Sequence, residues 1–290
     1  MIGMGASLAA ALMRLTPRDR ALMQVLHELR YLTVHQIQVL CYCSVSVRAT
    51  SCRLTLLRER GLLDCLLHRR FDDRRAFWCL SSLGRIVAGA LADVPPDRPR
   101  SCALAGLYME HLIATNQVFC GLCLEYRAGR LGMFRWFGSH HAGVDLGETR
   151  LVPDAVILAA TPEDRWWMYC LELDRHTMAP DALWEKFGRY RLMRRLASLH
   201  RDDPLWEARA SGWMLFACQD ARRAELASRL AAECGLDGVW AGTAAELPMS
   251  LAASLGAGVA ASRMASLPGL SGGITPPADV RLNGGGEGHR

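Results

Sequence analysis

Length, composition and charge place this chain among globular proteins. It has 290 residues, 51% of them hydrophobic and 22% charged, which excludes an intrinsically disordered chain and leaves room for two domains with separate cores. The net charge of +5 is uneven, because residues 14–100 carry 15 Arg and only 8 Asp or Glu. The N-terminal part therefore favours a phosphate-rich partner, and the rest of the chain does not.

Eleven cysteines without regular spacing argue against a disulfide framework and favour a reducing cytoplasm. The pairs Cys41/Cys43 and Cys120/Cys123 raise the question of zinc, but no second pair of Cys or His follows them at finger-like spacing. The apolar stretches near the two ends are too short to span a bilayer. We therefore expect a cytoplasmic protein with no membrane partner and no structural zinc at these cysteines.

Three helices are predicted at the start of the basic part. Thr16 and Pro17 form a typical helix start, with Thr as the N-cap and Pro in the first helical position. Thr33 caps a second, short helix, and Ser46 begins a third that continues to residue 60. Gly61 then ends the third helix, at a position that favours a left-handed backbone.

A hairpin and a fourth helix follow. Apolar runs at 62–67 and 76–80 flank a charged segment, which predicts two strands joined by a charged tip, and 81–91 predicts a helix. This order of elements resembles a winged helix-turn-helix, in which the third helix enters the major groove of DNA and the hairpin contacts the backbone. A winged helix that binds protein instead of DNA is the alternative.

Basic and small polar side chains mark the surface that would contact DNA. Arg48, Ser51 and Thr55 are spaced so that they share one exposed face of the third helix. Arginine can read guanine, but it contacts phosphate more often. The full predicted DNA-binding set comes from the third helix and the hairpin: Arg48, Ser51, Arg53, Thr55, Arg58, Arg69, Arg70, Arg74 and Arg75.

A Pro-rich linker at 94–101 divides the chain. We place the winged helix at 14–93, a second domain at 102–247, and a tail rich in Gly and Pro at 248–290 that we expect to be disordered. The second domain is predicted to run helix, three strands, helix, strand, helix, strand. That order indicates a mixed sheet covered by helices, so the expected fold class is α/β in the broad, α+β sense.

Three carboxylates fall on two of these strands. Glu172 and Asp174 are two residues apart in a predicted strand and therefore point to the same face. Asp154 follows Pro153 at the start of the neighbouring strand and would approach Glu172 if the two strands pair. Asp154 and Glu172 are thus the predicted ligands of a hard cation such as Mg²⁺.

Lysine occurs once in the chain. Of the 34 Lys and Arg residues only Lys186 is lysine, and it lies just downstream of the acidic residues. Lysine offers a compact point charge, and phosphodiester chemistry with Mg²⁺ often places such a cation beside the attacked phosphate. A strong preference for arginine that spared one lysine by chance is the alternative.

These motifs resemble the PD-(D/E)XK nuclease-like superfamily, whose core runs α-β-β-β-α-β. Pro153-Asp154 would be its first acidic element and Glu172 its second. Asp174 stands where that superfamily usually has lysine, and Lys186 would have to supply the cation from the following helix. The resemblance therefore implies Asp154, Glu172, Asp174 and Lys186 as catalytic candidates, and it leaves open whether the site is active.

The chain as a whole resembles a narrower group, the replication-relaxation family. The most specific block is Leu171-Glu172-Leu173-Asp174-Arg175, followed by Lys186-Phe187-Gly188-Arg189-Tyr190 and Leu215-Phe216-Ala217-Cys218. The resemblance covers roughly residues 15–247. It implies a role in replication and relaxation of plasmid or other mobile-element DNA, without implying that the protein cuts DNA.

Several functions remain open at this point. The first is a DNA-binding protein of replication or relaxation whose nuclease-like domain is degenerate. The others are an active Mg²⁺-dependent nickase using Asp154, Glu172 and Lys186, a winged-helix transcriptional regulator, and a module that only binds protein. For the carboxylates the structural alternative is an ion pair, either Asp174 with Arg175 or Glu172 with Lys186, which would pin the helix to the sheet.

Expected partners and cofactors follow from these functions. Double-stranded DNA is the main expected partner, with plasmid replication proteins, relaxases and a second copy of the chain as further candidates. Magnesium is expected only if the site is catalytic. We interpret His140-His141 as a loop pair in preference to metal ligands, and at least one of Trp166 and Trp167 as core in preference to base stacking.

Overall fold

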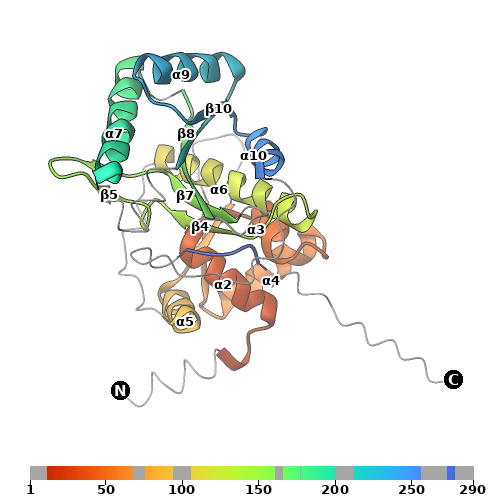
Figure 1. The fold of residues 1–290 in the computed structure, drawn as a ribbon. Helices are drawn as coiled ribbons and strands as arrows, with labels where there is room; N and C mark the ends of the chain where they lie inside the picture. Colours follow the sequence, from red (N-terminus) through yellow and green to blue (C-terminus); the bar gives the residue numbers. More distant parts are fainter. Residues whose placement is uncertain are drawn as a thin grey trace.

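A computed structural model describes residues 12–67, 76–93, 106–160, 166–176, 178–199, 212–255 and 273–277. The basic N-terminal helices lie at one end of the molecule, and a sheet covered by helices lies at the other (Figure 1). Among the residues described, no helix is both long and apolar enough to cross a membrane.

Helices and a small antiparallel sheet make up the N-terminal part. The helices are α2 (Pro17–Leu29), α3 (Val34–Cys41), α4 (Val47–Glu59) and α5 (Ser82–Ala92). The strands pair in the order β1-β3-β2 and are β1 (Leu32–Thr33), β2 (Leu63–Leu67) and β3 (Ala76–Leu80). This is the predicted order of helix, helix, helix, hairpin and helix, with the two-residue β1 as an addition.

Local capping explains where these helices begin. Thr16 and Asp19 form a capping box at α2, in which each side chain bonds the other residue's backbone N–H. Thr33 and Gln36 do the same at α3, and the Ser46 hydroxyl accepts from the third residue of α4. The predicted N-caps are therefore confirmed.

The second part is built on a five-stranded mixed sheet. Its elements in chain order are α6 (Gly106–Arg127), β4 (Phe134–Gly138), β7 (Ala155–Ala160), β8 (Trp166–Asp174), α7 (Pro180–Leu199), β9 (Trp213–Cys218), α9 (Ala221–Glu233) and β10 (Val239–Thr243). The sheet order is β10-β9-β8-β7-β4, antiparallel from β4 to β8 and parallel from β8 to β10. The fold class is mixed α/β, as predicted; the short pair β5 (Val144–Asp145) and β6 (Arg150–Leu151) was not predicted.

Alternation along the strands gives the sheet two apolar faces. On β8, Tyr169 and Leu171 join the core that includes α6, whereas Met168 and Cys170 join the core that includes α7 and α9. Figure 1 shows α7 and α9 at the outer end of the sheet and α6 closer to the N-terminal helices. By the same alternation, the Glu172 side chain belongs to the α7 face.

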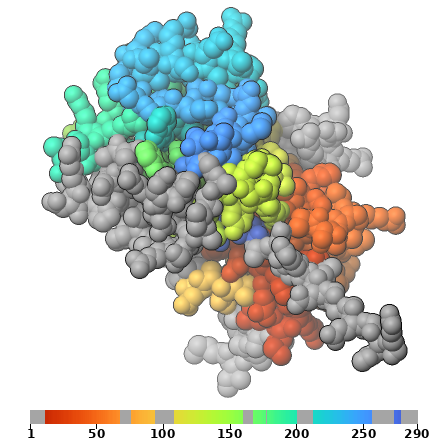
Figure 2. Space-filling view, turned by 45° about the vertical axis from the view of Figure 1, so that its right-hand side comes forward, coloured from red at the N-terminus to blue at the C-terminus, as the bar shows by residue number. Residues whose placement is uncertain are grey.

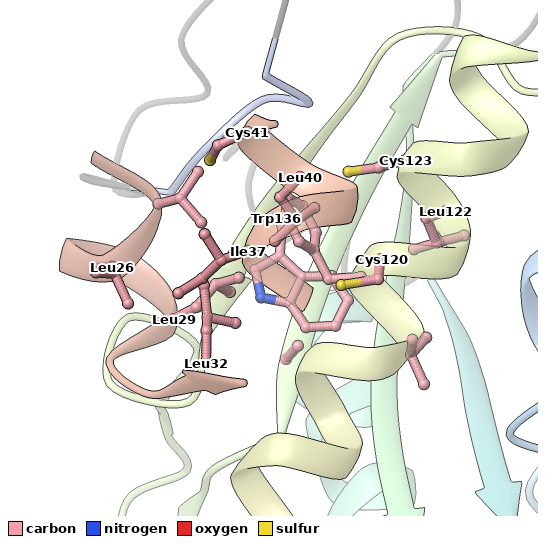
Figure 3. Packing of buried hydrophobic residues seen from close by; sticks show 14 of the residues in the cluster. Leu26, Leu29, Leu32, Ile37, Leu40, Cys41, Cys120, Leu122, Cys123 and Trp136 are labelled. Carbon is pink, nitrogen blue, oxygen red and sulfur yellow. The ribbon is translucent and has the colours of Figure 1, made fainter. Parts of the chain in front are cut away.

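One apolar cluster joins the N-terminal part to the second part. Leu29 and Ile37 from the N-terminal helices pack in the same buried cluster as Phe119 of α6 and Trp136 of β4 (Figure 3). The buried Asn116 amide adds a polar link, donating to the carbonyl oxygens of Leu29 at 3.0 Å and Tyr31 at 2.9 Å. The residues of the predicted linker lie outside the described part of the chain.

Of the cysteine pairs considered for zinc, Cys43 is exposed and the other three cysteines are core residues. Cys41, Cys120 and Cys123 are buried in the shared cluster, and Figure 3 shows their sulfur atoms among leucine side chains. Burial raises the pKa of Cys120 to about 12. A neutral thiol in apolar surroundings is a packing group, not a metal ligand.

The C-terminal region is partly structured, which corrects the predicted disordered tail. Helix α10 (Leu247–Leu255) packs against α6, so closely that a Cβ added at Gly121 would lie 2.5 Å from the Pro248 ring. Farther along, Ile274 pairs with Trp136 on the free side of β4. The Ala- and Ser-rich composition of the following residues hid this helix, whose Leu247, Leu251 and Leu255 are buried.

Candidate functional site

Strand pairing places Asp154 directly opposite Glu172. Ala155 of β7 pairs with Leu171 of β8, so the next residues outward are Asp154 and Glu172. The Asp154 N–H donates to the Leu171 carbonyl oxygen at 3.0 Å, and the Asp154 Oδ2 accepts from the Leu173 N–H at 2.8 Å. The backbone of β8 therefore holds the Asp154 carboxylate in place. Asp154 also lies beside Glu172, as the sequence analysis expected if the two strands pair.

Helix α7 brings two side chains onto Glu172. Lys186 Nζ donates to Glu172 Oε2, and the Tyr190 hydroxyl donates to Glu172 Oε1 at 2.7 Å. Lys186 and Tyr190 are four residues apart and so lie on one face of the helix. The Glu172 side chain is completely buried, and the ion pair with Lys186 is the one that the structural alternative anticipated.

His111 completes this cluster from the opposite side. It lies on α6, and its Nε2 is 2.9 Å from Asp154 Oδ1, with about a quarter of the side chain exposed. The sequence analysis gave His111 no role in the site. In the sequence, His111 stands out only as a polar residue on a long apolar helix. Its spacing does not indicate contact with a strand more than forty residues later.

Burial and charge together set the protonation of the cluster. Burial raises the pKa of Glu172 to about 7, against the pull of Lys186. Burial also opposes ionisation of Asp154, but the His111 hydrogen bond and the Lys186 charge outweigh it and lower the Asp154 pKa. Burial works against the Lys186 charge too, yet Glu172 and Asp154 raise the pKa of Lys186, so the lysine is a cation at neutral pH.

Asp174 bonds a different helix from Glu172, although its charge also helps to raise the pKa of Lys186. Its carboxylate is fully buried and bonds Arg223 Nε from α9, and Arg223 also donates to the Met178 carbonyl oxygen. The alternative pair Asp174–Arg175 is wrong, because Arg175 instead bonds Glu110 Oε2 at 2.7 Å. Asp174 therefore has a buried cationic partner and fixes α9 to the end of β8.

Chemically, the cluster offers two carboxylates, a lysine, a tyrosine and a histidine within hydrogen-bonding reach. Carboxylate oxygens are suitable ligands for Mg²⁺. In this conformation, however, each oxygen of Asp154 and Glu172 already accepts a hydrogen bond from the protein. The residues fit a hard cation by type, and Lys186 and His111 would have to share these oxygens with it.

The structure places the predicted DNA-binding residues in different environments. Arg48, Thr55 and Arg58 are exposed on α4, and Ser51 is half-buried there. Arg53 differs, because its guanidinium bonds the buried Asp19, through Nε at 2.9 Å and through Nη2. Arg53 thus anchors α4 to α2, and the hairpin arginines Arg69, Arg70, Arg74 and Arg75 lie outside the described residues.

The family model described as replication-relaxation matches residues 23–203, more than half of the chain. The chain belongs to the replication-relaxation family. No curated protein and no solved structure matches it.

Family membership gives the chain a role in replication or relaxation. The matched range begins within α2 and ends just beyond α7, so it includes α4, Asp154, Glu172 and Lys186. Arg223 and α10 lie outside it. The parts of the replication-relaxation protein that carry the site therefore coincide with the parts that define the family.

Proposed function

We propose that this replication-relaxation protein binds double-stranded DNA of a plasmid or mobile element through α4 and the β2–β3 hairpin. In this proposal the acidic cluster under α7 is a closed ion-pair network that fixes the sheet to its helix. The observation that carries the proposal is the exposed face of α4, which presents Arg48, Thr55 and Arg58 without any acidic partner among the described residues.

The surroundings of α4 support this assignment. Figure 2 shows the orange segment that includes α4 at the surface, away from α9. The buried Asp19 holds Arg53 and accepts a hydrogen bond from the Tyr42 hydroxyl at 2.9 Å. A helix that is fixed by its inner face and basic on its outer face is suited to present cations to a phosphate backbone.

Fluorescence anisotropy with a labelled duplex tests the proposal. We expect the double variant Arg48→Gln/Arg58→Gln to weaken duplex binding by roughly tenfold or more, because two phosphate contacts are lost. Arg229→Gln is the matched control, because Arg229 is an exposed arginine on α9, at the opposite end of the molecule from α4. Equal losses in both variants, or no duplex binding by the wild type, would contradict the proposal.

A second candidate function is a Mg²⁺-dependent nickase, and the meeting of Asp154, Glu172 and Lys186 favours it. Asp154 and Glu172 would hold the ion, which would supply a Lewis acid and an activated water. Lys186 would hold a positive charge beside the scissile phosphate, and His111 would fix Asp154. Asp174, bonded to Arg223, would assist only by positioning the end of β8.

Supercoiled plasmid incubated with Mg²⁺ or Mn²⁺ separates the two functions. Wild-type protein that shifts the plasmid without breaking a strand supports the DNA-binding function alone. Nicked product from the wild type, absent with Asp154→Asn and Lys186→Met but present with Arg189→Met, would establish the nickase. Nicking that survives Asp154→Asn would remove Asp154 from the site.

A further inference from the structure

A second group of ligand-type side chains lies between the N-terminal helices and the sheet. Glu28 is in the last turn of α2 and is almost completely buried. His140 and His141 follow β4, and their rings lie with centroids 4.0 Å apart and tilted by 46° to one another. The three residues come from segments more than a hundred positions apart, so the fold itself brings them together.

The distances in this group match those between ligands of one metal ion. His140 Nε2 is 3.6 Å and His141 Nε2 is 3.5 Å from the same oxygen, Glu28 Oε2. These distances exceed those of good hydrogen bonds. Ligands about 2 Å from a tetrahedral ion lie roughly 3.3 Å from one another, and one ligand atom from each residue falls within 4.8 Å of the others.

Backbone N–H groups of Gly138 and Gly273 hold the Glu28 carboxylate, and its Oε2 lies beside both histidines. The Gly138 N–H donates to Glu28 Oε1 at 2.6 Å. A hydrogen bond to the second oxygen of a ligand is the usual way in which proteins orient a metal-binding carboxylate. Gly138 is also close to the imidazole, because a Cβ there would lie 3.1 Å from His140.

A small cavity beside the group gives independent support. It holds about 10 Å³, room for one water molecule, and Glu28, His140, Trp136 and Arg30 are among the residues that line it. Within the described residues, Trp136 Nε1 and Arg30 Nη2 are buried nitrogen atoms without a hydrogen-bond partner. Both are donors, so they suit the oxygen of a water molecule held in this cavity.

We propose that Glu28, His140 and His141 bind a zinc-class divalent ion that joins α2 to the loop after β4. Two imidazoles and one carboxylate with a water in the fourth position are a donor set of the kind that zinc takes in proteins, and they are softer than the oxygen ligands of Asp154 and Glu172. The site would fasten the N-terminal part to the sheet. Its three ligands are different residues from those of the acidic cluster, although Asp154 also lines the small cavity, and the proposal does not depend on the proposed function.

Zinc titration of the chelator-treated full chain tests this proposal. Calorimetry should show one tight site per chain, and zinc should raise the unfolding temperature. His140→Asn and His141→Asn should each weaken zinc binding more than roughly 100-fold, because each removes a ligand and not merely an outer contact. His35→Asn is the matched control, because His35 is an exposed histidine on α3 outside the group.

Cobalt spectroscopy of the wild type decides the ligand type even if a variant fails to fold. A tetrahedral Co²⁺ spectrum without strong thiolate bands supports the imidazole and carboxylate ligands. Thiolate bands would instead assign the metal to cysteines and overturn the proposal. Zinc binding that is absent from the wild type, or that is unchanged in folded His140→Asn and His141→Asn proteins, would overturn it as well.

Discussion

Replacing Lys186 with methionine tests how much the lysine charge stabilises the protein through its ion pair with the buried Glu172. The substitution keeps the length of the side chain and removes its charge, leaving the fully buried Glu172 with the Tyr190 hydroxyl as its hydrogen-bond donor at 2.7 Å. Breaking a buried ion pair by removing one partner costs about 3–5 kcal/mol. We expect a loss of that size in the free energy of unfolding at about pH 8.

The loss of unfolding free energy in Lys186→Met should become smaller as the pH falls. Burial raises the pKa of Glu172 from 4.5 to about 7, so Glu172 adds stability that is fully present below pH 4.5 and is lost as the pH rises through 7. Removing the lysine raises that pKa further. Near pH 5 Glu172 is therefore mostly protonated in both proteins, and the difference should fall to about 1 kcal/mol, the contribution of one hydrogen bond.

Guanidinium unfolding followed by tryptophan fluorescence at both pH values measures this difference. Arg189→Met is the control, because Arg189 lies on the same helix with 45% of its side chain exposed, 3.8 Å from an exposed Glu185. The free energy of unfolding of this control should fall by less than about 0.5 kcal/mol at either pH. A Lys186→Met loss that equals the control, or that does not change with pH, would refute this account of the cluster.

Three further substitutions test the packing that supports the site, each measured by chemical unfolding. Asp19→Ala should lower the free energy of unfolding by about 3–5 kcal/mol, because it leaves the Arg53 guanidinium and the buried Tyr42 hydroxyl without their carboxylate. A change near zero would contradict the proposal that Arg53 anchors α4. Gly84→Ala should cost about 1–3 kcal/mol or more, since its Cβ would lie 2.0 Å from the Leu62 carbonyl oxygen, and a neutral effect would show that α5 can shift. Asn116→Ala should cost about 1–3 kcal/mol through two lost hydrogen bonds, and an unchanged midpoint would mean that water replaces the amide.

Local patterns in the sequence predicted most of the elements. Caps such as Thr16 and Thr33 fixed helix starts, because the capping interaction lies within four residues. The alternation along β8 correctly predicted which face of the sheet carries the Glu172 side chain, because successive residues of a strand point to opposite faces. Asp154 opposite Glu172 followed from a hairpin-like pairing of neighbouring strands.

Contacts between distant segments could not be predicted in the same way. Arg223 reaches Asp174 only because α9 packs beside the end of β8, and no local rule prefers it over the adjacent Arg175. His111 reaches Asp154 across the sheet edge for a similar reason. Arg53 fitted the basic pattern of α4, but its position toward Asp19 depends on how α2 and α4 cross.

The salt dependence of duplex binding tests the central claim most directly. If Arg48 and Arg58 contact phosphates, the plot of log affinity against log salt should be steep for the wild type. Its slope should be shallower by about 2 in Arg48→Gln/Arg58→Gln, because each lost phosphate contact removes roughly 0.9. A slope that is unchanged in this variant, with Arg229→Gln as the reference, would show that the exposed face of α4 does not bind DNA.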